Sequence, residues 1–217
     1  MTPDLFANAD DGRPAQHAIV PGAVLLPRFA LANERELLTA LRQVLAVAPF
    51  RPMTTHGGYT MSVQLSSCGS LGWVSDDHGY RYRRRDPLTQ QPWPAMPPLF
   101  LELAQTAAAA AGFSLFMPDA CLINRYEPGA RMSLHQDRNE RDFTQPIVSV
   151  SLGLPAVFEL GGLQRSDKTL RIPLAHGDVV VWGGPSRLRF HGVLPVKAGH
   201  HSLLGAQRIN LTFRRAG

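Results

Sequence analysis

The chain has 217 residues, 44% of them hydrophobic, which predicts a single globular unit with a sizeable core. Lysine and arginine number 22 against 17 for aspartate and glutamate, so the formal net charge is +5 and a polyanionic partner fits. Two distant cysteines exclude a disulfide framework, and the lack of a signal peptide or a long apolar run argues against secretion or a membrane span. We therefore expect a cytoplasmic protein with no membrane partner.

Two helices are predicted in the first half of the chain. Residues 1–30 are rich in proline and read as irregular, and residues 33–48 then carry helical periodicity. Asn33 is the expected N-cap, with Glu36 in the position of a capping box. A second helix is expected over residues 97–112, because prolines begin that stretch and a glycine ends it.

Residues 50–96, between the two helices, have a different composition. Glycine, proline, tryptophan, tyrosine and arginine alternate with short runs such as YTMSVQ, which indicates hairpins and exposed loops that form an appended binding surface. The run GYRYRRRDP, residues 79–87, places four arginines around two tyrosines. Cations that reach phosphates and rings that stack on bases favour contact with nucleic acid, although a solvated charged face is the alternative.

From residue 120 onward, short apolar runs are separated by turns. The expected strands are CLINRY, IVSVSLG, AVFELG, TLRIPL, DVVVW, RLRFHGV and RINLTF. This spacing predicts an all-β sandwich or barrel, so the fold class is mainly β with flanking helices.

The last of these strands carries cations on one face. Period-2 alternation places Arg208, Asn210, Thr212 and Arg214 on one side and Ile209, Leu211 and Phe213 on the other. If the strand is exposed, the two guanidiniums are merely solvated. If it lines a barrel, they need carboxylate partners, which a dicarboxylate ligand would supply. The run CLINRY likewise puts Asn124 and Tyr126 on one face.

A metal site is suggested by His135 and Asp137, which are two residues apart and can point to the same side of a strand or of the turn that closes it. Such a pair alone is more often a solvated loop. His176, His200 and His201 lie in turns or glycine-flanked loops and are expected at the surface. His191 ends an alternating run, and two histidines with one carboxylate are the ligand set of non-haem Fe(II) oxygenases.

These residues and several longer motifs together resemble a known family. The motifs GGYTMSV, LGWVSDDHGYRY, NRYEPGARMSLHQD, IVSVSLGLPAVFELGG, HGDVVVWGG and NLTFRRAG are similar to the AlkB family of Fe(II)/2-oxoglutarate dioxygenases from about residue 50 to the C-terminus. The resemblance implies a double-stranded β-helix, or jelly roll, with an N-terminal nucleotide-recognition lid. It implies an N-terminal segment and helix over residues 1–50, the lid over 51–96, and the dioxygenase domain with its preceding helix over 97–217.

The resemblance also implies roles for individual residues, with Fe(II), 2-oxoglutarate and dioxygen as cofactors. The iron ligands are His135, Asp137 and His191. The expected 2-oxoglutarate contacts are Asn124, Tyr126, Arg208, Asn210 and Arg214. The expected substrate contacts are Met61, Trp73, Tyr80, Arg81, Tyr82, Asn139 and Arg165. The alternative for Trp73 is an anchor in the core.

One position departs from the family pattern. Where the family reads His-x-Asp-x-Asp, this chain reads HQDRN, so Asn139 replaces an acid that contacts the alkylated base. A negative charge there favours cationic lesions, and asparagine supplies polarity without charge. We expect cationic lesions to be less strongly preferred over neutral ones than in relatives that carry the acid.

The implied function is oxidative dealkylation of bases such as 1-methyladenine and 3-methylcytosine in single- or double-stranded DNA, or in RNA, with release of formaldehyde. The enzyme is expected to act as a monomer. A 2-oxoglutarate-dependent hydroxylase of protein or small-molecule substrates is the alternative, because this fold serves many chemistries. A non-catalytic nucleic-acid-binding module is a further alternative, although it predicts a damaged metal site.

Overall fold

The computed structural model describes residues 16–217 except residue 56, and the main strands of this part of the chain form two facing sheets. The large sheet has the order β1 (His17–Val20), β2 (Ala23–Leu26), β12 (Val179–Trp182), β9 (Ile147–Gly153), β14 (Arg208–Arg214), β7 (Ala120–Tyr126), β4 (Thr60–Gly69) and β3 (Arg51–Thr54). The small sheet has the order β11 (Leu170–Leu174), β10 (Ala156–Leu160), β13 (His191–Val193) and β8 (Met132–His135). Together they form the expected jelly roll.

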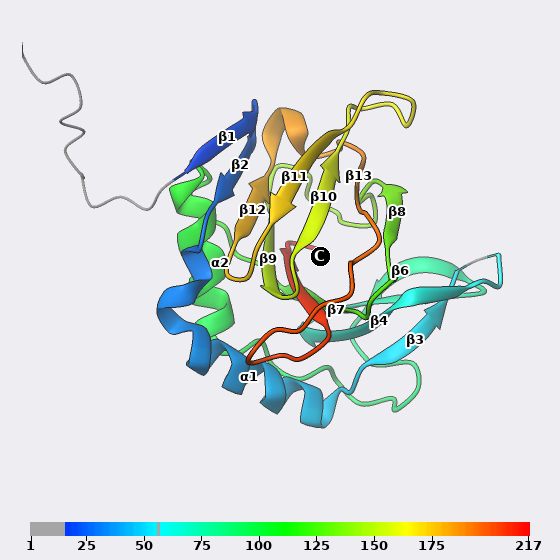
Figure 1. Ribbon diagram of the computed structural model, residues 1–217. Coiled ribbons are helices and arrows are strands. Elements are labelled where there is room, and N and C mark those ends of the chain that lie inside the picture. The colour runs from blue at the N-terminus through cyan, green and yellow to red at the C-terminus, as the bar shows by residue number, and fades with distance from the viewer. Residues whose placement is uncertain (1–15, 56) are drawn as a thin grey trace, which may run out of the picture.

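Two helices cover the outer face of the large sheet. Helices α1 (Glu34–Val47) and α2 (Pro98–Ala110) lie on the same side of the molecule (Figure 1). The buried side chains of both helices share one core cluster with the outward-facing residues of β14 and β9. Within the described residues no helix is long and apolar enough to cross a bilayer.

The inner faces of the two sheets form a second core. Trp182 and Val180 of the large sheet pack with Phe158 and Leu160 of the small sheet. Strand β14 shows how the sequence separates the two cores, because Ile209, Leu211 and Phe213 join the helix-side cluster. The polar residues of β14 point into the space between the sheets, which confirms the predicted alternation.

The region between the helices contains one hairpin that stands apart from both sheets. Strands β5 (Gly72–Asp76) and β6 (Gly79–Arg83) pair only with each other, and we call them the lid hairpin. Strands β3 and β4 continue the large sheet instead, because β4 pairs with β7 along its second half.

Three local predictions are wrong. Residues 17–26 are not irregular, because β1 and β2 form a hairpin that pairs with β12, and this tertiary pairing overrides the local proline and glycine signals. Asn33 is the N-cap of α1 but its side chain makes no capping hydrogen bond, since a 3-10 helix over Phe29–Asn33 leads directly into the α-helix. The expected strand over residues 187–193 begins only at His191, because a 3-10 helix at Gly184–Ser186 and a loop precede it.

Candidate metal centre

Strand pairing in the small sheet brings two histidines together. His135 ends β8, His191 begins β13, and the two are direct cross-strand partners. Asp137 follows β8 by two residues, and its oxygens lie 3.7 Å from Nε2 of each histidine. One ligand atom from each of the three residues lies within 4.8 Å of the other two. Sequence reasoning found all three.

The backbone fixes which nitrogen of each histidine is free. His135 Nδ1 lies 2.9 Å from the carbonyl oxygen of Ser133, and His191 Nδ1 lies 3.0 Å from that of Arg189. A carbonyl oxygen only accepts, so Nδ1 donates in both rings and Nε2 keeps its lone pair. Both free nitrogens face the Asp137 carboxylate, which is the donor set expected for Fe(II).

Arg214 holds the Asp137 carboxylate in its ionised form. The Arg214 guanidinium donates from Nε and a terminal nitrogen to Asp137 Oδ2, at 2.8 and 2.6 Å. Burial opposes ionisation of Asp137, but Arg214 and the two histidines outweigh it and hold the pKa of the carboxyl well below its usual range. A permanently ionised carboxylate is what a divalent cation requires.

A small cavity between the sheets, which we call the inner cavity, adjoins the metal ligands. Its volume is about 50 Å³, and it is lined by Asn124 and Tyr126 of β7 and by Arg208, Asn210 and Arg214 of β14. A water occupies about 10–15 Å³ on this measure, so the inner cavity suits a small ligand and not a nucleoside. Register explains the grouping, because Arg208 pairs with Tyr126 and Asn210 with Asn124.

Arg208 is buried with most of its hydrogen-bonding capacity unused. Its exposed fraction is 1%, and its Nε and one terminal nitrogen have no partner among the residues that the structure describes, while the other terminal nitrogen donates to Ser151 Oγ at 3.0 Å. Burial lowers the pKa of Arg208, and the polar group of the neighbouring Tyr126 compensates only in part; the Tyr126 ring centroid lies 4.8 Å from the guanidinium. An unpaired buried guanidinium is costly, so the inner cavity fits a ligand that carries a carboxylate.

A larger cavity of about 450 Å³ opens on the other side of the metal ligands, and we call it the base pocket. It is lined by Met61, Trp73, Tyr80, Asn139 and Arg165, together with His135 and Asp137. The Trp73 and Tyr80 rings stack with centroids 5.5 Å apart, and Arg165 donates to the carbonyl of Leu134 at 2.6 Å. Trp73 also packs against the cluster of Met53, Leu65 and Leu122, so it is both anchored and exposed to the pocket.

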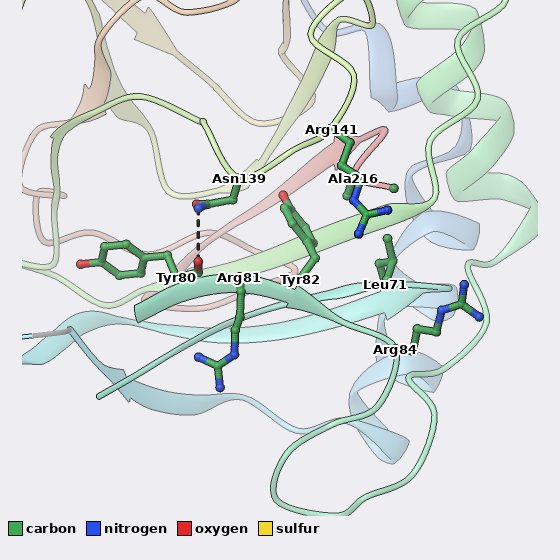
Figure 2. Close-up of a pocket in the computed structure, with 9 residues that line it drawn as sticks. Leu71, Tyr80, Arg81, Tyr82, Arg84, Asn139, Arg141 and Ala216 are labelled. Carbon is green, nitrogen blue, oxygen red and sulfur yellow. Dashed lines mark hydrogen bonds between the residues drawn. The ribbon is translucent and has the colours of Figure 1, made fainter. Parts of the chain in front are cut away.

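Two of the expected substrate contacts do not line the base pocket. Arg81 points away from Asn139 and Tyr82 (Figure 2), and its guanidinium pairs with Asp76 at 2.6 Å. Tyr82 donates its hydroxyl to Glu140 at 2.7 Å, on the far side of Tyr80 from the pocket. Alternation along β6 separates Arg81 from its two neighbours.

Several polar residues near the centre were missed by sequence reasoning. Glu140 is buried and pairs with Arg187 at 3.1 Å, and it lies 3.5 Å from Arg214. No local pattern identifies this pair, because Arg187 reads as part of a strand. Ser149 and Ser151 of β9, which bond Asn210 and Arg208, could have been found from the alternation of IVSVSLG.

Among the described residues, His176, His200 and His201 are not part of the centre. His200 is exposed as expected, but His176 is half-buried and accepts a hydrogen bond from the Gly153 amide at 2.7 Å. Its Nε2 lies 2.6 Å from Glu34 of α1, and His201 stacks on its ring. The prediction of a surface position for His176 is therefore wrong, because α1 and the loop that carries His201 cover its turn.

Comparison with known proteins agrees with this geometry. The family model described as "2OG-Fe(II) oxygenase superfamily" matches residues 22–214. The alpha-ketoglutarate-dependent dioxygenase AlkB of Salmonella typhimurium is 58% identical over 213 residues, which are 98% of this chain and 97% of that protein. The chain belongs to the AlkB family within the 2OG-Fe(II) oxygenase superfamily.

More distant AlkB relatives share the fold. The DNA N(6)-methyladenine demethylase ALKBH1D of Arabidopsis thaliana is 29% identical over 92% of this chain and 50% of that protein. The solved structure of OsALKBH1 superposes with a TM-score of 0.80 at 28% identity, covering 93% of this chain and all of that one. The protein is thus an Fe(II)- and 2-oxoglutarate-dependent dioxygenase, with dioxygen as its second co-substrate.

The metal-free centre should destabilise the protein in mild acid. Burial and the nearby charge of His135 lower the pKa of His191 to about 4. The unfolded chain, where histidine titrates near 6.5, takes up this proton first as the pH falls. Stability is therefore present above pH 6.5 and is lost as the pH falls toward 4, by about 3 kcal/mol for this one group.

Urea denaturation of the metal-free protein between pH 7 and pH 4.5 measures this loss. Because other groups also titrate, the decisive quantity is the difference between wild type and His191→Gln, whose pH dependence should be flatter. Parallel curves for the two proteins would contradict the assignment.

Proposed function

We propose that the protein removes N-alkyl groups from nucleic-acid bases by oxidation, with 1-methyladenine and 3-methylcytosine in DNA or RNA as substrates. One observation carries the proposal: the two histidines and Asp137 stand between an inner cavity that fits a small dicarboxylate and a base pocket flanked by stacked aromatic rings. The relative ALKBH1D, a DNA N(6)-methyladenine demethylase, supports this substrate class. The comparisons give no support to a protein or small-molecule substrate.

The proposed ligands of Fe(II) are His135, Asp137 and His191, because their free atoms converge on one point. Arg208 and Arg214 are proposed to bind the carboxylates of 2-oxoglutarate. The two unpaired guanidinium nitrogens of Arg208 can bind one carboxylate in a bidentate manner, and Arg214 lies beside the Asp137 carboxylate. Asn124, Tyr126 and Asn210 complete the lining of this site.

We propose that residues 51–96 form the nucleotide-recognition lid, between the segment 1–50 and the dioxygenase domain 97–217. A flipped base would stack against Trp73 and Tyr80, near Met61, Asn139 and Arg165. Arg81 and Tyr82 are assigned to the support of the lid hairpin, since their polar groups are bonded to Asp76 and Glu140.

When bound, Fe(II) with 2-oxoglutarate and dioxygen supplies the oxidation: 2-oxoglutarate is converted to succinate and carbon dioxide, and the second oxygen atom hydroxylates the N-alkyl carbon. The bond between the hydroxymethyl carbon and the base nitrogen then breaks, which gives formaldehyde and the unmodified base, still attached to its sugar. The protein's own residues orient the reactants, exclude water and keep Asp137 ionised, and no protein nucleophile is required.

The partner is proposed to be single- or double-stranded nucleic acid, bound by a monomer in the cytoplasm. The exposed Arg84 and Arg141 beside the lid hairpin suit phosphates, and the aromatic rings of the base pocket suit unstacked bases. Either form of the substrate offers both once a base is flipped.

The proposal predicts formaldehyde release from an oligonucleotide that contains 3-methylcytosine, in the presence of Fe(II) and 2-oxoglutarate. Asp137→Ala should lose this activity by at least about 1,000-fold, because it removes a metal ligand, whereas Asp142→Ala, which removes a half-buried carboxylate outside the metal centre, should retain it. Circular dichroism checks that both variants are folded. Succinate formation without formaldehyde from any alkylated oligonucleotide would sink the proposed substrate.

Asn139 should set the preference among lesions. Its side chain lies at the rim of the base pocket and donates to the Tyr80 carbonyl at 3.2 Å. In Asn139→Asp the added negative charge should raise the ratio of turnover on cationic 3-methylcytosine to turnover on a neutral etheno adduct by roughly tenfold. Asn139→Ala is the matched control, because it loses the same hydrogen bond without adding charge. Equal ratios in the two variants would show that charge at this position has no role.

A further inference from the structure

A groove lies beside the lid hairpin and next to the base pocket, and we call it the basic groove. It consists of three adjoining hollows of about 340, 310 and 450 Å³. Arg84 lines all three, Leu71 and Gly217 join the first to the second, and Ser70 and Asp119 join the second to the third. Each hollow has the size of a small-molecule site, so the groove is long enough for an extended ligand.

The charged side chains of the basic groove are mainly arginines. Arg84 and Arg141 are exposed, and neither guanidinium has a hydrogen bond or ion pair with any residue between 16 and 217 that the structure describes. Arg215 lies 3.7 Å from Asp119, whose oxygens already accept the amides of Ala216 and Gly217. Two free cations thus remain for a ligand.

The basic groove meets the base pocket at a thin wall. Tyr80 and Asn139 line both spaces, and they are joined by the hydrogen bond from Asn139 to the Tyr80 carbonyl. Figure 2 shows Arg84 and Arg141 beyond this wall, around Leu71 and Ala216. A chain whose one unit enters the base pocket can therefore continue over the wall into the groove.

We propose that the basic groove binds the phosphate backbone of the nucleic-acid strand that flanks the flipped base. The inference rests on the proposed function, and it adds a contact surface outside the base pocket. Regularly spaced phosphates match guanidiniums that have no protein partner. An acidic peptide is the other polyanion that fits, but the shared wall with the base pocket favours the strand that already delivers its base there.

The test compares the double variant Arg84→Gln/Arg141→Gln with Arg35→Gln/Arg42→Gln, which removes two exposed arginines from α1 and gives the same net charge. Fluorescence anisotropy measures binding of Mn(II)-loaded protein to a single-stranded 15-mer and to a trinucleotide, each with one 3-methylcytosine, at several salt concentrations. Decaglutamate is the acidic-peptide competitor. Formaldehyde release from the trinucleotide is measured separately.

The groove variant should bind the 15-mer roughly tenfold more weakly at about 0.1 M salt, and its slope of log affinity against log salt should fall by about 1.4, which is two single-strand phosphate contacts. The α1 variant should match wild type, and the trinucleotide should bind all three proteins alike. An unchanged slope in the groove variant overturns the inference. The inference is also overturned if decaglutamate, at a concentration equal to that of the 15-mer, displaces the 15-mer from wild type but not from the groove variant.

Failure of the groove inference and failure of the proposed function give different results. If the trinucleotide yields formaldehyde and the groove variant still binds the 15-mer like wild type, the function stands and the groove inference is overturned. If no alkylated oligonucleotide yields formaldehyde, the proposed function fails and the inference fails with it.

Discussion

The contact between Arg214 and Asp137 is the interaction on which the centre depends. Arg214 ends β14 in the large sheet, and Asp137 follows β8 in the small sheet, so their two close contacts join the sheets at the metal position. Removing one partner of such a buried pair typically costs about 3–5 kcal/mol, because the other charge is left unpaired. The pair is extended by Glu140, which also contacts Arg187 and Tyr82. The lid hairpin is thereby linked to the metal carboxylate.

Arg208 lies on the same strand and face as Arg214, but its guanidinium has no carboxylate partner among the described residues. It shares the burial of Arg214, yet no carboxylate neutralises it and two of its nitrogens have no partner. The two ends of one seven-residue strand thus carry a cation that the protein pairs itself and a cation that fits a ligand. This difference explains how one face of β14 can serve both the metal and a small dicarboxylate.

Short-range periodicity in the sequence predicted the helices, the strands and the cavity face, whereas the jelly roll, the lid and the roles of the site residues were implied by the resemblance to the AlkB family. Alternation in β14 and β7 sorted Arg208, Asn210 and Asn124 onto the cavity face, and the spacing of His135 and Asp137 put them on one side. Residues 17–26 could not be placed, because their strands exist only through pairing with β12, which is distant in sequence. The ion pair of Glu140 and Arg187 could not be predicted for the same reason, because the two residues are 47 positions apart in the sequence.

In the lid hairpin, the resemblance to the family did not predict which side chains face the base pocket. Tyr80, Arg81 and Tyr82 were all expected to contact the substrate, but strand alternation turns Arg81 toward Asp76 and leaves Tyr80 at the base pocket. Arg84 and Arg141, whose guanidiniums pair with no described residue, line the basic groove and come from segments more than fifty residues apart. Only folding makes them neighbours.

The central claim is that Arg208 is a carboxylate site completed by 2-oxoglutarate. Isothermal titration of 2-oxoglutarate into Mn(II)-loaded wild type and Arg208→Gln tests it most directly. We expect Arg208→Gln to bind 2-oxoglutarate roughly 100-fold more weakly, because charge-assisted hydrogen bonds are lost. Its affinity for Mn(II) should change by less than about threefold. Equal 2-oxoglutarate affinity in the two proteins would contradict the claim.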